Sequence, residues 1–145
     1  MINARIDTTT GLDGERVVLA CFDVDGAEVA ALAHAVKAVS GERYRDHDMS
    51  VDDVLELREL TALADELGSL VVLEDGLRTV VMRPARLTAS RDAVSSFVDS
   101  RDYAEFVREE DREPLARVRP LVPALEDLCA DALRAVFGTG SPLSG

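Results

Sequence analysis

Four arginines occur together in a stretch of the chain that has no acidic residue. Between Gly76 and Arg91 there is no Asp or Glu, although the whole chain has 28 acidic and 16 basic residues. Guanidinium groups bind phosphate and carboxylate through paired hydrogen bonds, and a helix N-terminus adds unpaired N–H groups. The four arginines are Arg78, Arg83, Arg86 and Arg91. The stretch predicts an anion-binding site made by Arg83, Arg86 and Arg91. The alternative is that these arginines pair with carboxylates of the chain itself.

Two aspartates follow an apolar run in the sequence Phe22-Asp23-Val24-Asp25-Gly26. A carboxylate can act as a nucleophile or as a general acid/base. This pattern resembles the first motif of haloacid dehalogenase-like phosphatases, and departs from it at Ala27, where that family usually has threonine or valine. The resemblance covers this one motif; it implies a parallel sheet, Asp23 as nucleophile, Asp25 as general acid/base and a magnesium ion. The alternative is an Asp-rich turn in which Asp25 caps a helix.

The other candidate chemistry is a histidine between two acids, Asp46-His47-Asp48. Histidine and carboxylates suit a divalent metal, but adjacent residues rarely converge on one ion, so we predict a solvated acidic loop. His34 lies beside the apolar stripe of a predicted helix, which predicts a packed or half-exposed imidazole. The sequence has neither a glycine-rich phosphate loop before a helix nor a nucleophile elbow around a serine. We therefore expect no catalytic site, no metal and no cofactor.

The composition limits the classes of protein to which the chain can belong. Its 145 residues fit one domain, and 47% of them are hydrophobic, enough for a core. The net charge of −12 disfavours nucleic acid and anionic lipid as partners, and an aromatic content of 4% without Trp disfavours base stacking. No apolar run is long enough to cross a bilayer, and the N-terminus lacks the plan of a signal peptide, so we expect a cytosolic protein. Cys21 and Cys129 lie in apolar contexts and are expected to be buried thiols.

The elements that must position these residues are predicted from turns and hydrophobic spacing. Residues 70–82 are two apolar runs joined by Asp75-Gly76, which predicts a central β-hairpin. Residues 2–6 alternate and residues 17–22 form an apolar run, which together predict a first hairpin. Helical spacing and capping signals predict four helices, and a charged linker before the last of them. The predicted ranges are residues 25–41, 50–68, 88–107 and 120–136 for the helices and 108–114 for the linker.

These elements predict an α+β fold with the order ββααββαα. Four antiparallel strands in two hairpins carry four helices on one face. We expect a single domain over residues 1–137 and a flexible tail over residues 138–145. The leading functional prediction is a cytosolic, non-enzymatic binding or regulatory domain that acts through protein contacts, with a homodimer expected from the exposed sheet edges. The alternatives are a small-molecule or phosphate-binding domain using residues 78–91, and a phosphatase using Asp23 and Asp25.

Overall fold

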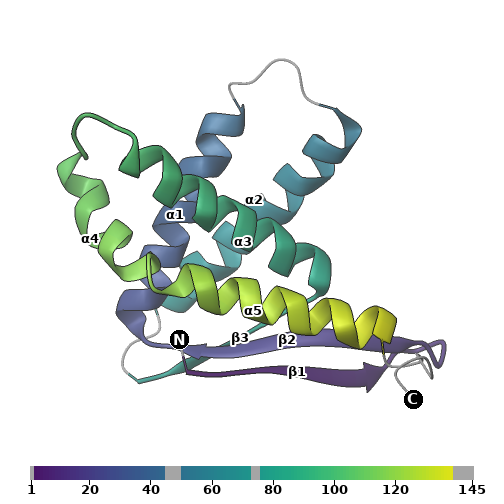
Figure 1. The fold of residues 1–145 in the computed structure, drawn as a ribbon. Helices are drawn as coiled ribbons and strands as arrows, with labels where there is room; N and C mark the ends of the chain where they lie inside the picture. The colour runs from purple at the N-terminus through teal and green to yellow at the C-terminus, as the bar shows by residue number, and fades with distance from the viewer. Residues whose placement is uncertain (1, 45–49, 73–75, 139–145) are drawn as a thin grey trace.

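The described part of the chain is a three-stranded antiparallel sheet with helices on one face (Figure 1). The computed structural model describes residues 2–44, 50–72 and 76–138. The strands follow the spatial order β1-β2-β3. The elements are β1 (Ile2–Thr10), β2 (Arg16–Val24), α1 (Gly26–Tyr44), α2 (Val51–Val72), β3 (Arg78–Met82), α3 (Pro84–Asp102), α4 (Glu109–Val118), α5 (Leu121–Leu133) and a π-helical turn (Arg134–Gly138).

The first predicted hairpin is confirmed, because β1 and β2 pair directly. Their register sets Ile6 opposite Ala20 and Thr10 opposite Arg16. Gly14 lies in the connecting turn with a φ of 76°, a conformation that residues with a Cβ adopt at a cost. The N–H of Gly14 donates to the carbonyl of Gly11 at 3.0 Å. The turn therefore sets the register of the hairpin.

The predicted central hairpin is wrong, and with it the four-stranded sheet and the order ββααββαα. Residues 70–72 are the last residues of α2, and β3 pairs with β2 instead, with Val80 opposite Phe22. Of the predicted turn Asp75-Gly76, Asp75 lies outside the described residues, as do residues 73 and 74. A short apolar run fits a strand or a buried helix equally well. Here Val71 continues the helical spacing of Leu67 in the sequence, and the helix passes through Gly68 instead of stopping there.

The helix predictions are correct in part. α1 starts as predicted but continues past Gly41, and α3 begins at Pro84, earlier than the predicted caps. The charged linker at residues 108–114 is wrong, because α4 begins at Glu109 and contains Pro114. The buried positions of α4 are Asp111, Leu115 and Val118. A buried aspartate in the helical stripe hides the apolar pattern that would have predicted this helix.

One hydrophobic core lies between the sheet and the helix layer. The inward side chains of β2 and β3 pack under α1, α3 and α5, with Phe22 and Phe97 among the largest fully buried residues. The side chains that alternate with them, such as Asp23 and Thr79, point to the opposite face of the sheet. In Figure 1 the helices all lie on one side of the sheet. None of the helices in the described ranges has the length and apolar character needed to span a membrane.

Gly76 precedes β3 with a φ of 84°, and Gly76→Ala should lower the free energy of unfolding by about 1 kcal/mol. A Cβ built on Gly76 meets no atom within 4 Å, so the cost comes from the backbone conformation alone. Gly26 is the matched control, because its Cβ position is equally open and its φ is not positive. Gly26→Ala should leave the free energy unchanged or raise it slightly. Chemical denaturation measures both variants, and equal effects would contradict the strained conformation at Gly76.

Candidate functional site

The three arginines predicted to bind an anion lie at the start of α3 and along it, and Arg86 is already bonded to carboxylates. Its Nε donates to Glu59 at 3.2 Å, and its Nη1 donates to Glu66 at 2.6 Å. Both glutamates belong to α2, so Arg86 joins α2 to α3. Arg83 and Arg86 line a concavity of about 500 Å³ beside β3, and Arg91 is not among its lining residues. The structure therefore brings two of the three arginines to one concavity.

Arg91 is bonded to a neighbour on its own helix. Its Nε and Nη2 donate to one oxygen of Asp92, at 3.1 and 2.9 Å. The hydrogen bond to Asp92 raises the pKa of Arg91 above its ordinary value. Arg83 stands directly before α3, where its side chain makes no capping hydrogen bond. The anion site stays a prediction, and pairing with the chain's own carboxylates is observed for Arg86 and Arg91.

Asp23 and Asp25 are held by different parts of the structure. Asp23 accepts hydrogen bonds from Thr79 Oγ1 at 2.6 Å and from Asn3 Nδ2 at 3.3 Å. The bond from Thr79, followed by that from Asn3, lowers the pKa of Asp23. Asp25 accepts from the N–H of Glu28 at 2.7 Å, and Glu28 accepts from the N–H of Asp25 at 3.0 Å. Asp25 thus caps α1. The sheet is antiparallel, whereas the phosphatase resemblance implies a parallel sheet. The catalytic roles implied by that resemblance stay a prediction.

Metal-ligating side chains do not gather into a site in the described ranges. Among residues 2–44, 50–72 and 76–138, no three His, Cys, Asp or Glu side chains are grouped so that they could hold an ion. The segment Asp46-His47-Asp48 lies outside these ranges. Cys21 and Cys129 are both buried and free, as their apolar contexts predict.

A polar cluster around the buried Asp111, which the sequence did not predict, joins α1, α3 and α4. His34 Nε2 donates to Asp111 Oδ1 at 2.6 Å, and Arg101 Nε donates to Asp111 Oδ2 at 3.2 Å. Asp111 is buried, and the guanidinium of Arg101 lies 4.4 Å from the ring centre of Phe97. Burial by itself would raise the pKa of Asp111, but the hydrogen bonds from His34 and Arg101 together lower it. Asp111 therefore carries its negative charge in the helix layer, where it accepts hydrogen bonds from His34 and from the positively charged Arg101.

The recess beside His34 offers no nucleophile for this imidazole–carboxylate pair. It has a volume of about 270 Å³ and lies between α1 and α4. Its lining consists of three alanines, His34, a proline and the exposed residues Glu113 and Arg117. An imidazole that acts as a base in covalent catalysis needs a hydroxyl or thiol within hydrogen-bonding reach, and this lining has none. We therefore interpret the cluster as a structural contact that joins α1, α3 and α4.

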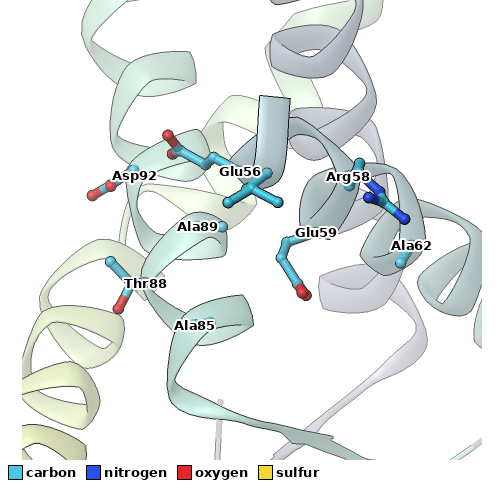
Figure 2. A pocket seen from close by; sticks show the side chains of 9 residues that line it. Glu56, Arg58, Glu59, Ala62, Ala85, Thr88, Ala89 and Asp92 are labelled. Atoms are coloured by element: carbon cyan, nitrogen blue, oxygen red, sulfur yellow. The ribbon is translucent and has the colours of Figure 1, made fainter. Parts of the chain in front are cut away.

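A groove of about 660 Å³ lies between α2 and α3. Figure 2 shows its α3 side, made by Ala85, Thr88, Ala89 and Asp92. These residues recur at spacings of three and four, so they lie along one side of the helix. The opposite side is made by residues of α2: Leu55, Glu56, Arg58, Glu59 and Ala62. The groove exists because alanines on both helices leave space that larger side chains would fill.

The lining of the groove combines apolar and charged side chains. Leu55, Ala62, Ala85 and Ala89 supply the apolar surface. In Figure 2 the side chain of Glu59 points into the space between the helices. The three carboxylates of the lining each have one arginine partner: Glu56 with Arg43, Glu59 with Arg86 and Asp92 with Arg91. A carboxylate with one partner keeps further acceptor positions for a ligand.

Comparison of the chain with protein-family models, curated proteins and solved structures found no match.

The sequence contains a signal for the groove that the helix prediction did not use. The core stripe of α2 includes Leu57, Leu60 and Leu67, which are buried. Val51, Leu55 and Ala62 recur at helical spacing on a different side of the same helix. A helix with a second apolar stripe needs a second covering surface. That stripe indicates an interaction surface, although it does not show that α3 forms the other wall.

Proposed function

We propose that this chain is a non-enzymatic, cytoplasmic protein-binding domain whose α2–α3 groove holds an amphipathic helix of a basic partner. The observation that carries the proposal is the apolar groove beside an exposed apolar stripe. On α2, Val51, Val54 and Leu55 are 77%, 42% and 52% exposed. Leu55 lines the groove, and Val51 and Val54 lie within about one helical turn of it on α2. Exposed large apolar side chains beside an apolar groove are typical of interaction sites. A groove between two helices accepts a third helix, whose apolar residues at spacings of three and four pack into it.

The charge of α2 argues for a basic partner. The helix contains six acidic residues and one basic residue, Arg58. Asp52 and Asp53 are exposed in its first turn. Lysines or arginines on the rim of a docked helix would meet these carboxylates, which favours both association rate and specificity. A second copy of this acidic helix would bring like charges together, so self-association through the groove is disfavoured.

The anion-site alternative has less support than the groove. A ligand that binds Arg86 must compete with two carboxylates at 3.2 and 2.6 Å. A ligand that binds Arg91 must compete with Asp92. A partner in the groove instead gains contacts with apolar atoms that solvent already reaches, so it displaces no bond within the chain.

A pair of designed peptides tests the groove. Both peptides carry leucines on one helical face; one has lysines and the other glutamates on the remaining positions. We expect the lysine peptide to bind, with Thr88→Trp weakening its affinity by about tenfold or more because the indole occupies the groove. Fluorescence anisotropy with a labelled peptide measures the affinity.

The matched control is Ser96→Trp, because Ser96 is exposed on α3 and is not among the residues that line the groove. This variant should bind the lysine peptide like the parent protein. Equal affinity for the lysine and glutamate peptides would contradict the basic partner. Equal affinity of the parent and Thr88→Trp would contradict the groove as the binding site.

A further inference from the structure

β1 is an edge strand whose outer side faces no other strand among the described residues. The sheet order places β2 on one side of β1, and β3 lies beyond β2 (Figure 1). The pairing with β2 is irregular between Ile2 and Arg5, whereas residues 5–10 pair in unbroken register. An irregularity protects an edge from pairing, and a regular stretch does not. Residues 5–10 are thus an open template for another strand.

The hydrogen bonds at the hairpin turn determine which residues of β1 direct their backbone N–H and C=O groups outward along this edge. The N–H of Gly11 donates to the carbonyl of Glu15 at 2.7 Å, so these two residues form a hydrogen-bonded pair. Such pairs alternate along an antiparallel ladder. Thr9, Asp7 and Arg5 therefore direct their backbone groups toward β2. Ile6, Thr8 and Thr10 direct theirs toward the open edge.

We propose that the occupant of this edge is β1 of a second copy of the chain, antiparallel and centred on Ile6. A twofold axis at Ile6 sets Ile6 opposite Ile6 of the second copy and lets each donate a hydrogen bond to the other. The same register sets Arg5 opposite Asp7 of the second copy, and Asp7 opposite Arg5. Both side chains are exposed to about half, at 45% and 56%. Two pairs of opposite charge thus form across the new strand pair.

Neighbouring registers are less complementary. A register centred on Asp7 sets Asp7 against Asp7, which places like charges directly opposite. A register centred on Thr8 sets Asp7 opposite Thr9 and leaves Arg5 without a charged partner. Residues directly opposite one another must share a face of the sheet. A pairing that sets Ile6 opposite Asp7 of the second copy would place a core-facing side chain against an outer one, so it is excluded. Within the regular stretch, the register centred on Ile6 pairs residues 5–7 of the two copies, and the register centred on Thr8 pairs residues 6–10. Charge complementarity selects the register centred on Ile6.

The resulting assembly is one continuous sheet built from the two three-stranded sheets. The twofold axis is perpendicular to the sheet, so both helix layers lie on the same face, and Ile6 stays on the core side where it packs in each copy. None of the residues that line the α2–α3 groove belongs to β1. This self-association is therefore independent of the proposed peptide binding, and the two can fail separately.

Charge reversal with mixing tests this pairing. Arg5→Asp gives a chain with acids at positions 5 and 7. Asp7→Arg gives a chain with arginines at these two positions. We expect the parent to self-associate in sedimentation equilibrium between micromolar and near-millimolar concentration. Each single variant should associate at least about tenfold more weakly than the parent. An equimolar mixture of the two variants should associate again, because acids then face arginines.

The mixture also separates interface effects from folding effects. Arg5 lies 3.7 Å from Asp7 and 3.9 Å from Asp23 within the chain, so a single variant can lose some stability on its own. Two chains that fail alone and associate together cannot be explained by damaged folding. The double variant Arg5→Asp/Asp7→Arg should self-associate like the parent. A parent that stays monomeric at every concentration, single variants that associate like the parent, or a mixture that stays monomeric would each overturn the proposal.

Discussion

Replacement of Asp111 by alanine is expected to lower the free energy of unfolding by about 3 kcal/mol, the lower end of the range for removing one member of a buried ion pair, because Arg101 keeps Glu42 as a partner. The side chain of Asp111 is 8% exposed, and both of its oxygens have partners. Without it, His34 loses its carboxylate partner, and Arg101 keeps only the half-exposed Glu42, which accepts a hydrogen bond from its Nη1 at 2.9 Å. The guanidinium of Arg101 is only 17% exposed, so water replaces the lost carboxylate poorly. Urea denaturation of the parent and the variant measures this loss.

Asp102 supplies the matched control for Asp111. It pairs with Arg119 through two bonds of 3.0 and 2.7 Å, so its geometry is at least as good. Both side chains of this second pair are exposed, at 40% and 52%. Exposed pairs contribute little because water solvates the separated partners. Asp102→Ala should therefore cost far less than Asp111→Ala, and similar losses would contradict the importance of burial at Asp111.

The stability that Asp111 supplies should depend on pH in a defined direction. Its pKa in the folded protein lies below the ordinary value of 3.8, because hydrogen bonds from His34 and Arg101 outweigh burial. The unfolded chain therefore takes up a proton first as the pH falls. The contribution is fully present above the ordinary pKa and is lost as the pH falls through the folded pKa. The difference in unfolding free energy between the parent and Asp111→Asn should shrink as the pH falls from about 5 toward about 3.

The sequence predicted the parts of the fold that rest on local chemistry. Asp25 with Glu28, and Ser50 with Asp53, form reciprocal caps where the sequence placed them. The β1–β2 hairpin formed around Gly14, where alternating and apolar runs flank a turn. In each case the residues that decide the structure are within a few positions of one another.

The sequence failed where tertiary packing decides between two local possibilities. The run at residues 70–72 suits a strand by β-branching and a helix by its spacing from Leu67; the chain makes it helical, and β3 pairs with β2. Helix α4 escaped prediction because Asp111 occupies a buried position that a helical pattern would fill with an apolar residue. The partners of Asp111 come from α1 and α3, and their distance in sequence hides them from any local pattern.

The candidate groove was hidden for a related reason. Its two walls come from α2 and α3, which are separated in the sequence by β3. The second apolar stripe of α2 is visible in the sequence, but the sequence does not show that α3 lies beside it. The arginine stretch was conspicuous in the sequence because it lacks acids. In the fold, Glu59 and Glu66 reach Arg86 from another helix, which no count along the stretch could reveal.

The second large effect is expected in α5, where Leu125→Ala should lower the free energy of unfolding by about 2–5 kcal/mol. Leu125 is 1% exposed and belongs to the hydrophobic core. Removing its branched end leaves a cavity in the core, where α5 lies over the sheet in Figure 1. Leu128 is equally buried, at 2%, so Leu128→Ala should cost a similar amount. Chemical denaturation gives both values.

Leu133 provides the control on the same helix, because its side chain is 51% exposed. Leu133→Ala removes the same atoms from the same kind of backbone and should change the free energy by only about 0.5 kcal/mol. Deletion of the chain from Leu121 onward removes every buried residue of α5 and should abolish cooperative unfolding, because the apolar side chains of β2 and α3 then meet water. A shortened chain that still melts cooperatively near the parent temperature would show that the sheet and the preceding helices fold without α5. Equal losses in Leu125→Ala and Leu133→Ala would contradict the burial of Leu125 in the core.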